Sequence, residues 1–256
     1  MTVGTPGDMT GDDEIGRAVG ALAAGEGDAT ALRRTAGLVR SSMRAAGTRS
    51  VATGRWLAEL VLDVAPHLPA RDLATLRDHH DGHSGQELAD ALIRNAARTT
   101  ATLGAVAGAV AGAEELAPPT WLALPAELVA ETLAVVAVEM KLVAELQAAC
   151  GRPITGTPAQ RGLAVARAWA DQRGVTPADL VQPGGLGQAL GRSSRREVAR
   201  VLQRRLTRRA LRNLPTLAPF LVGAVAGAEV NRRATRSLGE AVVRDLLGGG
   251  GRVGSP

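Results

Sequence analysis

Large aromatic side chains are almost missing from this chain, and their scarcity constrains how a core can be built. Among 256 residues there are three tryptophans, one phenylalanine and no tyrosine. Leucine, valine and alanine must therefore fill the interior, and small side chains favour helices packed closely against helices. The sequence has no run that combines β-branched alternation with hairpin turns, the pattern typical of strands. We therefore expect an all-α fold, a compact multi-helix bundle with Gly/Ala-rich, close-packed helices.

The helical pattern predicts one domain between two tails. Residues 1–11 form an acidic segment and residues 248–256 a Gly-rich one, and neither buries enough apolar surface to become ordered. We expect a single helical domain over residues 12–247, with a looser helical part before about His83. The single Cys150 excludes an internal disulfide, and the N-terminus has no secretory signal pattern. Both observations favour a cytoplasmic protein.

Capping residues and prolines predict three long helices, over residues 84–113, 125–150 and 157–173. The last of these opens with Thr157 and Gln160 in the spacing of a capping box.

The helix over residues 125–150 is apolar on most of its circumference, so we expect it to be largely buried. Its polar residues Glu127, Glu131, Lys141 and Glu145 fall on one stripe. Glu139 lies off that stripe and would need a partner in the core, for which an ion pair is the favoured interpretation.

Glycines recur every four residues in two segments of the chain. They are Gly104, Gly108 and Gly112 in the first segment and Gly223 and Gly227 in the second. Each glycine costs a helix about 1 kcal/mol relative to alanine, so the spacing indicates that another backbone packs there. We expect the two segments to pack against each other. The same spacing also serves a lipid-exposed face or an oligomer interface, and these alternatives stay open.

Positive charge is concentrated toward the C-terminus. The net charge of the chain is +5, whereas residues 192–245 contain thirteen arginines and four acidic residues, a net of 13 − 4 = +9. Residues 195–213 have an amphipathic helical pattern with arginines on one face, and an uncharged apolar segment follows. The candidate membrane or partner contacts are Arg200, Arg204, Arg208, Arg212, Leu217, Phe220, Leu221 and Val222. A basic helix beside a short apolar segment is typical of helices that lie in a membrane interface.

The basic helix has two other interpretations. A solvated surface helix is the default for a run of charges. Nucleic acid is disfavoured, because single-strand binders use stacking aromatics and no double-strand-reading motif is present.

The segment "DHHDGHS" concentrates three of the four histidines of the chain together with two carboxylates. His79, His80 and His83 fall within it, and His79 and His83 have the spacing of helical metal ligands. A solvated turn before the next helix is the favoured interpretation, because no second cluster supplies further ligands. Cys150 has no neighbouring base and is expected to be a small buried apolar residue. We expect no cofactor and no catalytic residue.

Residues 213–246 resemble the C-terminal signature of the EcsC family, in which a proline-containing apolar segment leads into a Gly-rich helix and then an amphipathic one. The matching residues are Pro215, Gly223, Gly227, Asn231, Thr235 and Gly239. The resemblance extends over about residues 84–246. It implies a bacterial, mostly helical protein with an affinity for membranes, and in the family's founding member an association with transport systems. It implies no catalytic residue.

Three hypotheses about function result. The first is a non-enzymatic accessory or interaction module at the inner face of the cell membrane, bound to anionic lipid or to a protein partner. The second is a soluble helical homo-oligomer or partner-binding module that uses the glycine faces. The third is a metal-dependent enzyme that uses His79, His80 and His83.

Overall fold

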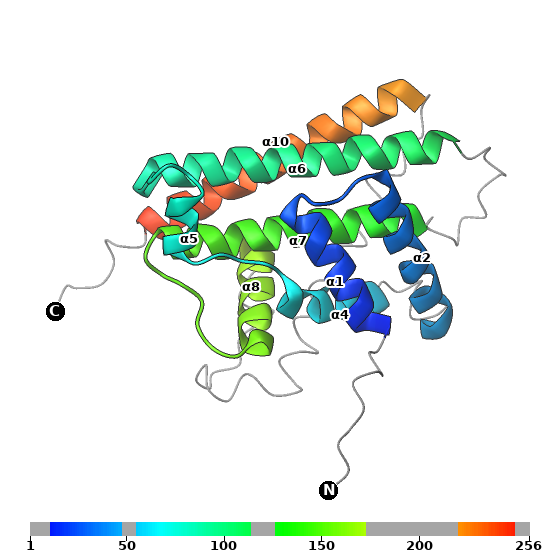
Figure 1. Ribbon diagram of the computed structural model, residues 1–256, viewed down its shortest axis with the longest axis horizontal. Helices are drawn as coiled ribbons and strands as arrows, with labels where there is room; N and C mark the ends of the chain where they lie inside the picture. The colour runs from blue at the N-terminus through cyan, green and yellow to red at the C-terminus, as the bar shows by residue number, and fades with distance from the viewer. Residues whose placement is uncertain (1–10, 48–54, 114–125, 173–219, 249–256) are drawn as a thin grey trace, which may run out of the picture.

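The computed structural model describes residues 11–47, 55–113, 126–172 and 220–248 (Figure 1). Over these residues the chain forms eight α-helices, one short 3-10 helix and no strand, which confirms the predicted all-α class. The helices are α1 (Gly11–Ala24), α2 (Ala29–Ala46), α4 (Arg55–Val64), the 3-10 helix η1 (Ala65–His67), α5 (Leu73–Asp78), α6 (Gly85–Ala113), α7 (Ala126–Ala149), α8 (Pro158–Gln172) and α10 (Phe220–Gly248).

Helix α7 lies at the centre of the bundle and contacts α1, α2, α4, α5, α6, α8 and α10. Its buried residues lie on all sides, as the apolar sequence pattern predicts. Neighbouring elements also cover the predicted polar stripe. Glu127 bonds to Arg40 of α2, and Glu145 bonds to Arg71 in the segment before α5. The stripe is therefore a set of contacts between helices rather than a solvated face.

Helices α6 and α10 run antiparallel and pack along each other (Figure 1). Two contacts set the register. A Cβ on Gly239 would lie 2.5 Å from Ile93 of α6, and the Thr100 hydroxyl donates to the Asn231 carbonyl at 3.5 Å. The two glycine-spaced segments thus belong to helices that do pack on each other, as we expected.

The same register, continued along the two helices, would place Gly104 opposite Gly227 and Gly108 opposite Gly223. Gly104 is buried. Gly108, Gly112, Gly223 and Gly227 lie within the two helices, but their surroundings are outside the described residues, so contact between the glycines themselves stays a prediction.

The N-terminal helices belong to the same core, contrary to the looser part expected before His83. Helices α1, α2 and α4 all contact α7, and Val19, Leu32 and Leu60 are buried with the residues of α7. The apolar stripes of these short helices are sufficient to close one side of the bundle.

The 3-10 helix η1 is held by very close backbone contacts that the sequence analysis did not foresee. A Cβ on Gly162 of α8 would lie 2.8 Å from the Pro66 nitrogen, and one on Gly20 of α1 would lie 2.9 Å from the His67 carbonyl oxygen. Glycine at these positions lets two helices approach η1 from different directions.

The capping box of α8 is confirmed. The Gln160 amide donates to the Thr157 hydroxyl at 3.3 Å, and the Thr157 amide donates back to the Gln160 side chain at 3.0 Å. Helix α1 begins at Gly11, one residue earlier than the predicted domain. The amphipathic helix predicted over residues 195–213 lies outside the described residues. The two predicted tails also lie outside them, except for Gly11, the first residue of α1, and Gly248, the last residue of α10.

Candidate functional site

The buried polar chemistry of the described core is concentrated on α7. Glu139 and Glu145 are 0% and 2% exposed, and both carboxylates meet side chains from distant parts of the chain. A charged group in such a place must be compensated, since burying a carboxylate without partners costs several kcal/mol. We therefore treat these carboxylates and their partners as the candidate site.

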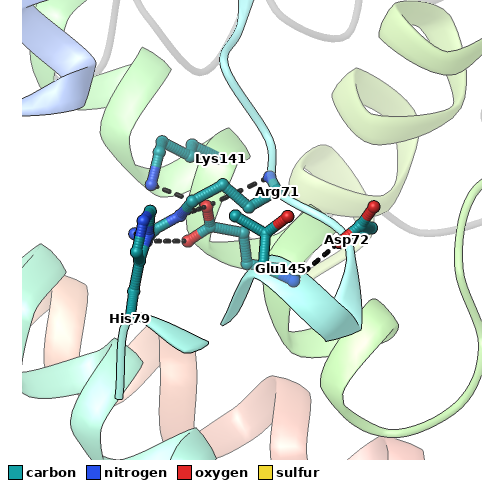
Figure 2. A network of polar contacts seen from close by, with 6 residues as sticks. Arg71, Asp72, His79, Lys141 and Glu145 are labelled. Carbon is teal, nitrogen blue, oxygen red and sulfur yellow. Dashed lines mark hydrogen bonds and ion pairs between the residues drawn. The ribbon is translucent and has the colours of Figure 1, made fainter. Parts of the chain in front are cut away.

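Two cations converge on the Glu145 carboxylate (Figure 2). Arg71 donates to Glu145 from Nε to Oε1 at 2.8 Å and from Nη2 to Oε2 at 3.2 Å, a two-point contact. Lys141, one turn earlier on α7, places its Nζ 2.7 Å from the same Oε1. The backbone amide of Arg71 also donates to Oε1, at 3.3 Å. The segment before α5 is thereby fixed to the central helix.

The pKa values of this cluster reflect a competition between burial and pairing. Burial is the largest effect on Glu145 and raises the carboxyl pKa, but hydrogen bonds and charges from Arg71 and Lys141 outweigh it, so the pKa lies below its ordinary value. Burial dominates at Lys141, and the pKa of its ammonium group is lowered despite Glu145. The hydrogen bond to Glu145 is the main reason that the pKa of Arg71 is raised.

Two histidines lie against this cluster. Nδ1 of His79 is 3.3 Å from Nη1 of Arg71 (Figure 2). Nε2 of His80 is buried and has no hydrogen-bond partner. Burial, followed by the charge of Arg71, lowers the pKa of His80, which favours a neutral ring near neutral pH.

The "DHHDGHS" segment forms the turn between α5 and α6. His83 is exposed, its amide donates to the His80 carbonyl at 2.9 Å, and Asp81 has a positive φ of 53°. Of the residues that the structure describes, no three histidines, cysteines or carboxylates are arranged to hold a metal ion. His79, His80 and His83 are therefore neighbours in sequence that do not form a common ligand set, and the metal-enzyme hypothesis gains no geometric support.

The Glu139 carboxylate joins α7 to α8 and α10. The Trp169 indole donates to Oε2 at 2.9 Å and the Thr235 hydroxyl donates to Oε1 at 3.2 Å. Trp169 and Thr235 are buried as well, at 2% and 0% exposure. The two donors that the structure describes at Glu139 are neutral, and the ion pair expected for this carboxylate stays a prediction.

A second contact between α7 and α10 lies nearer their N-termini, by about two turns on α7 and by about one turn on α10. The Asn231 side chain donates to Glu131 at 3.0 Å, and Asn231 is 6% exposed. Asn231, Thr235 and Gly239 are each four residues apart and together form the ridge by which α10 meets α7 and α6. Three of the residues that resemble the EcsC signature thus line a buried interface.

Other candidate residues fall where the structure gives no description. Arg200, Arg204, Arg208, Arg212, Pro215 and Leu217 are outside the described residues. Phe220, Leu221 and Val222 form the first turn of α10, but their side chains are not described. The basic face and the apolar contact therefore remain predictions.

Sequence reasoning missed Arg71 and Trp169. Arg71 pairs with a residue 74 positions away and Trp169 with one 30 positions away. Helical periodicity relates only residues three or four apart, so it could not find these partners. The available signal was the presence of acidic residues inside an apolar helix, which implies donors without naming them.

The contacts of Glu139 and Glu145 tie α7 to the segment before α5, to α8 and to α10. Cys150 is half-buried rather than fully buried, and its burial raises the pKa of the thiol, which disfavours the reactive thiolate. None of the helices that the structure describes is long and apolar enough to cross a membrane. In comparisons with protein-family models, with curated proteins and with solved structures, the chain matches none.

Proposed function

We propose that this protein is a non-enzymatic helical module of the EcsC type that works at the cytoplasmic face of the cell membrane, where it binds anionic lipid and serves as an accessory or interaction partner. The observation that carries the proposal is the charge between Arg192 and Arg212. This segment holds nine arginines and one glutamate, a net of 9 − 1 = +8 in 21 residues. An anionic surface attracts each such residue by about 1 kcal/mol.

The position of the charge along the chain supports this assignment. The uncharged segment that begins at Leu214 follows directly and continues into the first residues of α10. Only eight peptide units separate Arg212 from Phe220, so the two residues lie within about 28 Å of each other. The C-terminal end of the basic segment, at Arg212, is thus joined to α10 by a short stretch of chain.

The buried contacts of α10 support the same proposal. Asn231 and Thr235 bind the carboxylates of Glu131 and Glu139, which fixes the middle of α10 in the bundle. A membrane contact made at the start of this helix would therefore be held rigidly by the folded part of the protein. Such a contact needs no catalytic group, in agreement with the structural chemistry of the core.

Charge reversal tests the proposal. The double variant Arg200→Glu with Arg204→Glu should weaken binding to anionic vesicles more than tenfold, because it removes at least about 2 kcal/mol of attraction. Arg94→Glu with Arg98→Glu on α6 is the matched control, since both arginines are exposed, four residues apart and carry the same charge. Binding should be measured by vesicle co-sedimentation. If both double variants lose binding equally, net charge explains it and the proposed contact is wrong.

A further inference from the structure

Helix α2 carries a basic stripe on its exposed side. Residues 29–46 contain four arginines and no acidic residue. At 100° per residue, Arg33, Arg40 and Arg44 fall within about 40° of one another and span about 16 Å of the helix. All three are exposed, while Leu32, Ala36 and Val39 on another face of α2 are buried in the core.

The stripe has few acidic neighbours. Glu127 pairs with Arg40 at 2.5 Å, and Glu14 pairs with Arg34, which lies beside the stripe. The described residues form no ion pair with Arg33 or Arg44. Even Arg40 keeps 48% of its side chain exposed. Two charges of the stripe are therefore available to an external anion, and the third is partly so.

The position of α2 connects this stripe with the proposed membrane contact. Arg40 meets Glu127 in the first turn of α7. The contacts of Asn231 and Thr235 show that α7 and α10 run parallel, and α6 runs antiparallel to α10. The ends of α6 at Ala113, of α7 at Ala126 and of α10 at Phe220 thus meet at one end of the bundle, and α2 lies on that side (Figure 1). We call it the Glu127 end.

We propose that Arg33, Arg40 and Arg44 of α2 form a second basic surface that contacts the headgroups of anionic lipids at the Glu127 end. The inference rests on the proposed function, because the Arg192–Arg212 segment is tethered to this same end through Phe220. Together with the attachment of the basic segment to the chain at Phe220, the α2 surface would orient the bundle on the membrane with α2 toward the lipid. Charge complementarity identifies the occupant as an anionic surface.

The first test is binding of the full chain to vesicles made of equal amounts of phosphatidylglycerol and phosphatidylcholine. One arginine near such a surface strengthens binding by about fivefold, so Arg33→Gln with Arg44→Gln should weaken it by up to about 25-fold. Both residues are exposed, so the fold should be retained. Arg94→Gln with Arg98→Gln, which removes the same charge from an exposed face of α6, should change binding by less than about twofold.

A second test locates the surface directly. Cys150 is the only cysteine, so Cys150→Ser allows an environment-sensitive fluorophore to be placed at Ser41→Cys, on the exposed side of α2, or at Thr155→Cys, in the exposed loop after the opposite end of α7. Addition of the anionic vesicles should change the emission of the label at position 41 and leave that at position 155 unchanged.

The outcomes separate the two proposals. Loss of binding in the Arg33/Arg44 variant, with the label at position 41 responding, supports the inference. If the unaltered protein binds and the Arg200/Arg204 variant loses binding while the Arg33/Arg44 variant does not, the α2 surface is overturned and the proposed function survives. If the unaltered protein fails to bind anionic vesicles, both proposals are overturned.

Discussion

At the scale of single residues, the described contacts of two buried carboxylates on α7 involve different kinds of donor. Glu145 is held by two cations, Arg71 and Lys141. Glu139 accepts from the indole of Trp169 and the hydroxyl of Thr235, which are neutral donors. Removing Glu145 would leave Arg71 and Lys141 without their anion. Removing Glu139 would leave the Trp169 indole and the Thr235 hydroxyl without an acceptor.

Replacement of Glu139 by alanine should lower the free energy of unfolding by about 2–4 kcal/mol, because the buried Trp169 indole and Thr235 hydroxyl lose their acceptor. Glu139→Gln keeps an acceptor oxygen and should cost about 1 kcal/mol. Urea unfolding followed by circular dichroism measures both. Glu240→Ala, at an exposed position of α10, is the control and should stay within about 0.5 kcal/mol. A Glu139→Ala cost no larger than that of the control would contradict the assigned role.

In the second cluster, Glu145 should contribute more to the stability of the fold than Lys141 does. Glu145→Gln leaves Arg71 and Lys141 facing each other and should destabilise the fold by about 3 kcal/mol. Lys141→Met should cost less than about 1 kcal/mol, since Arg71 still pairs with Glu145 and the ammonium no longer has to be desolvated. Chemical denaturation of the two variants compares them. Equal losses would mean that both cations are required.

Glu145 should also give the fold a specific acid sensitivity. Its folded-state pKa lies below the ordinary value, so the carboxylate stabilises the folded state fully above the unfolded pKa of about 4.3, and this contribution is lost as the pH falls through the lowered pKa. Below about pH 4.3 the unfolding free energy of the native chain should therefore fall more steeply than that of Glu145→Gln. If the unfolding free energies of the native chain and of Glu145→Gln fall in parallel with pH, Glu145 is not a cause of the acid sensitivity.

At the scale of elements, glycine has two opposite roles in the helices of this bundle. Gly162 of α8 lies against the backbone of η1, where a Cβ would come within 2.9 Å of two backbone atoms. Gly37 of α2 is exposed, and a Cβ there would meet nothing within 4 Å. The first glycine is required by a close approach, and the second only weakens its helix.

Alanine substitutions separate these roles. Gly162→Ala should destabilise the protein by about 1–3 kcal/mol, since neither backbone atom of η1 can move independently. Gly37→Ala should stabilise it by about 0.5–1 kcal/mol through the better helix propensity of alanine. Thermal unfolding of the two variants provides the comparison. Similar effects at both positions would show that the contact with η1 is not tight.

Sequence reasoning worked for local elements and failed for partners distant in the chain. Thr157 and Gln160 predicted the start of α8, because a capping box depends on residues three apart. The repeated glycine spacing predicted the pairing of α6 with α10. The partners of Glu139 and Glu145 depend on how whole helices are arranged, and local spacing carries no information about that. Residues 195–213, the strongest amphipathic pattern, lie outside the described residues.

At the scale of the whole molecule, one central helix organises the bundle and one end of it collects the features proposed for membrane contact. Helix α7 connects the N-terminal helices to α6, α8 and α10. The exposed arginines of α2 and the first residue of α10, Phe220, lie at the Glu127 end. The Arg-rich segment precedes Phe220 in the chain. This asymmetry makes a definite orientation on an anionic surface the central claim about the protein.

Co-sedimentation of the full chain with vesicles, compared between anionic and neutral lipid and between low and high salt, tests that claim most directly. Attraction between surface charges is screened within about 8 Å at physiological ionic strength and within about 3 Å at 1 M salt. The account predicts binding to anionic vesicles at low salt, much weaker binding at high salt, and little binding to neutral vesicles. Failure to sediment with anionic vesicles, or equal and salt-independent binding to both kinds, would contradict it.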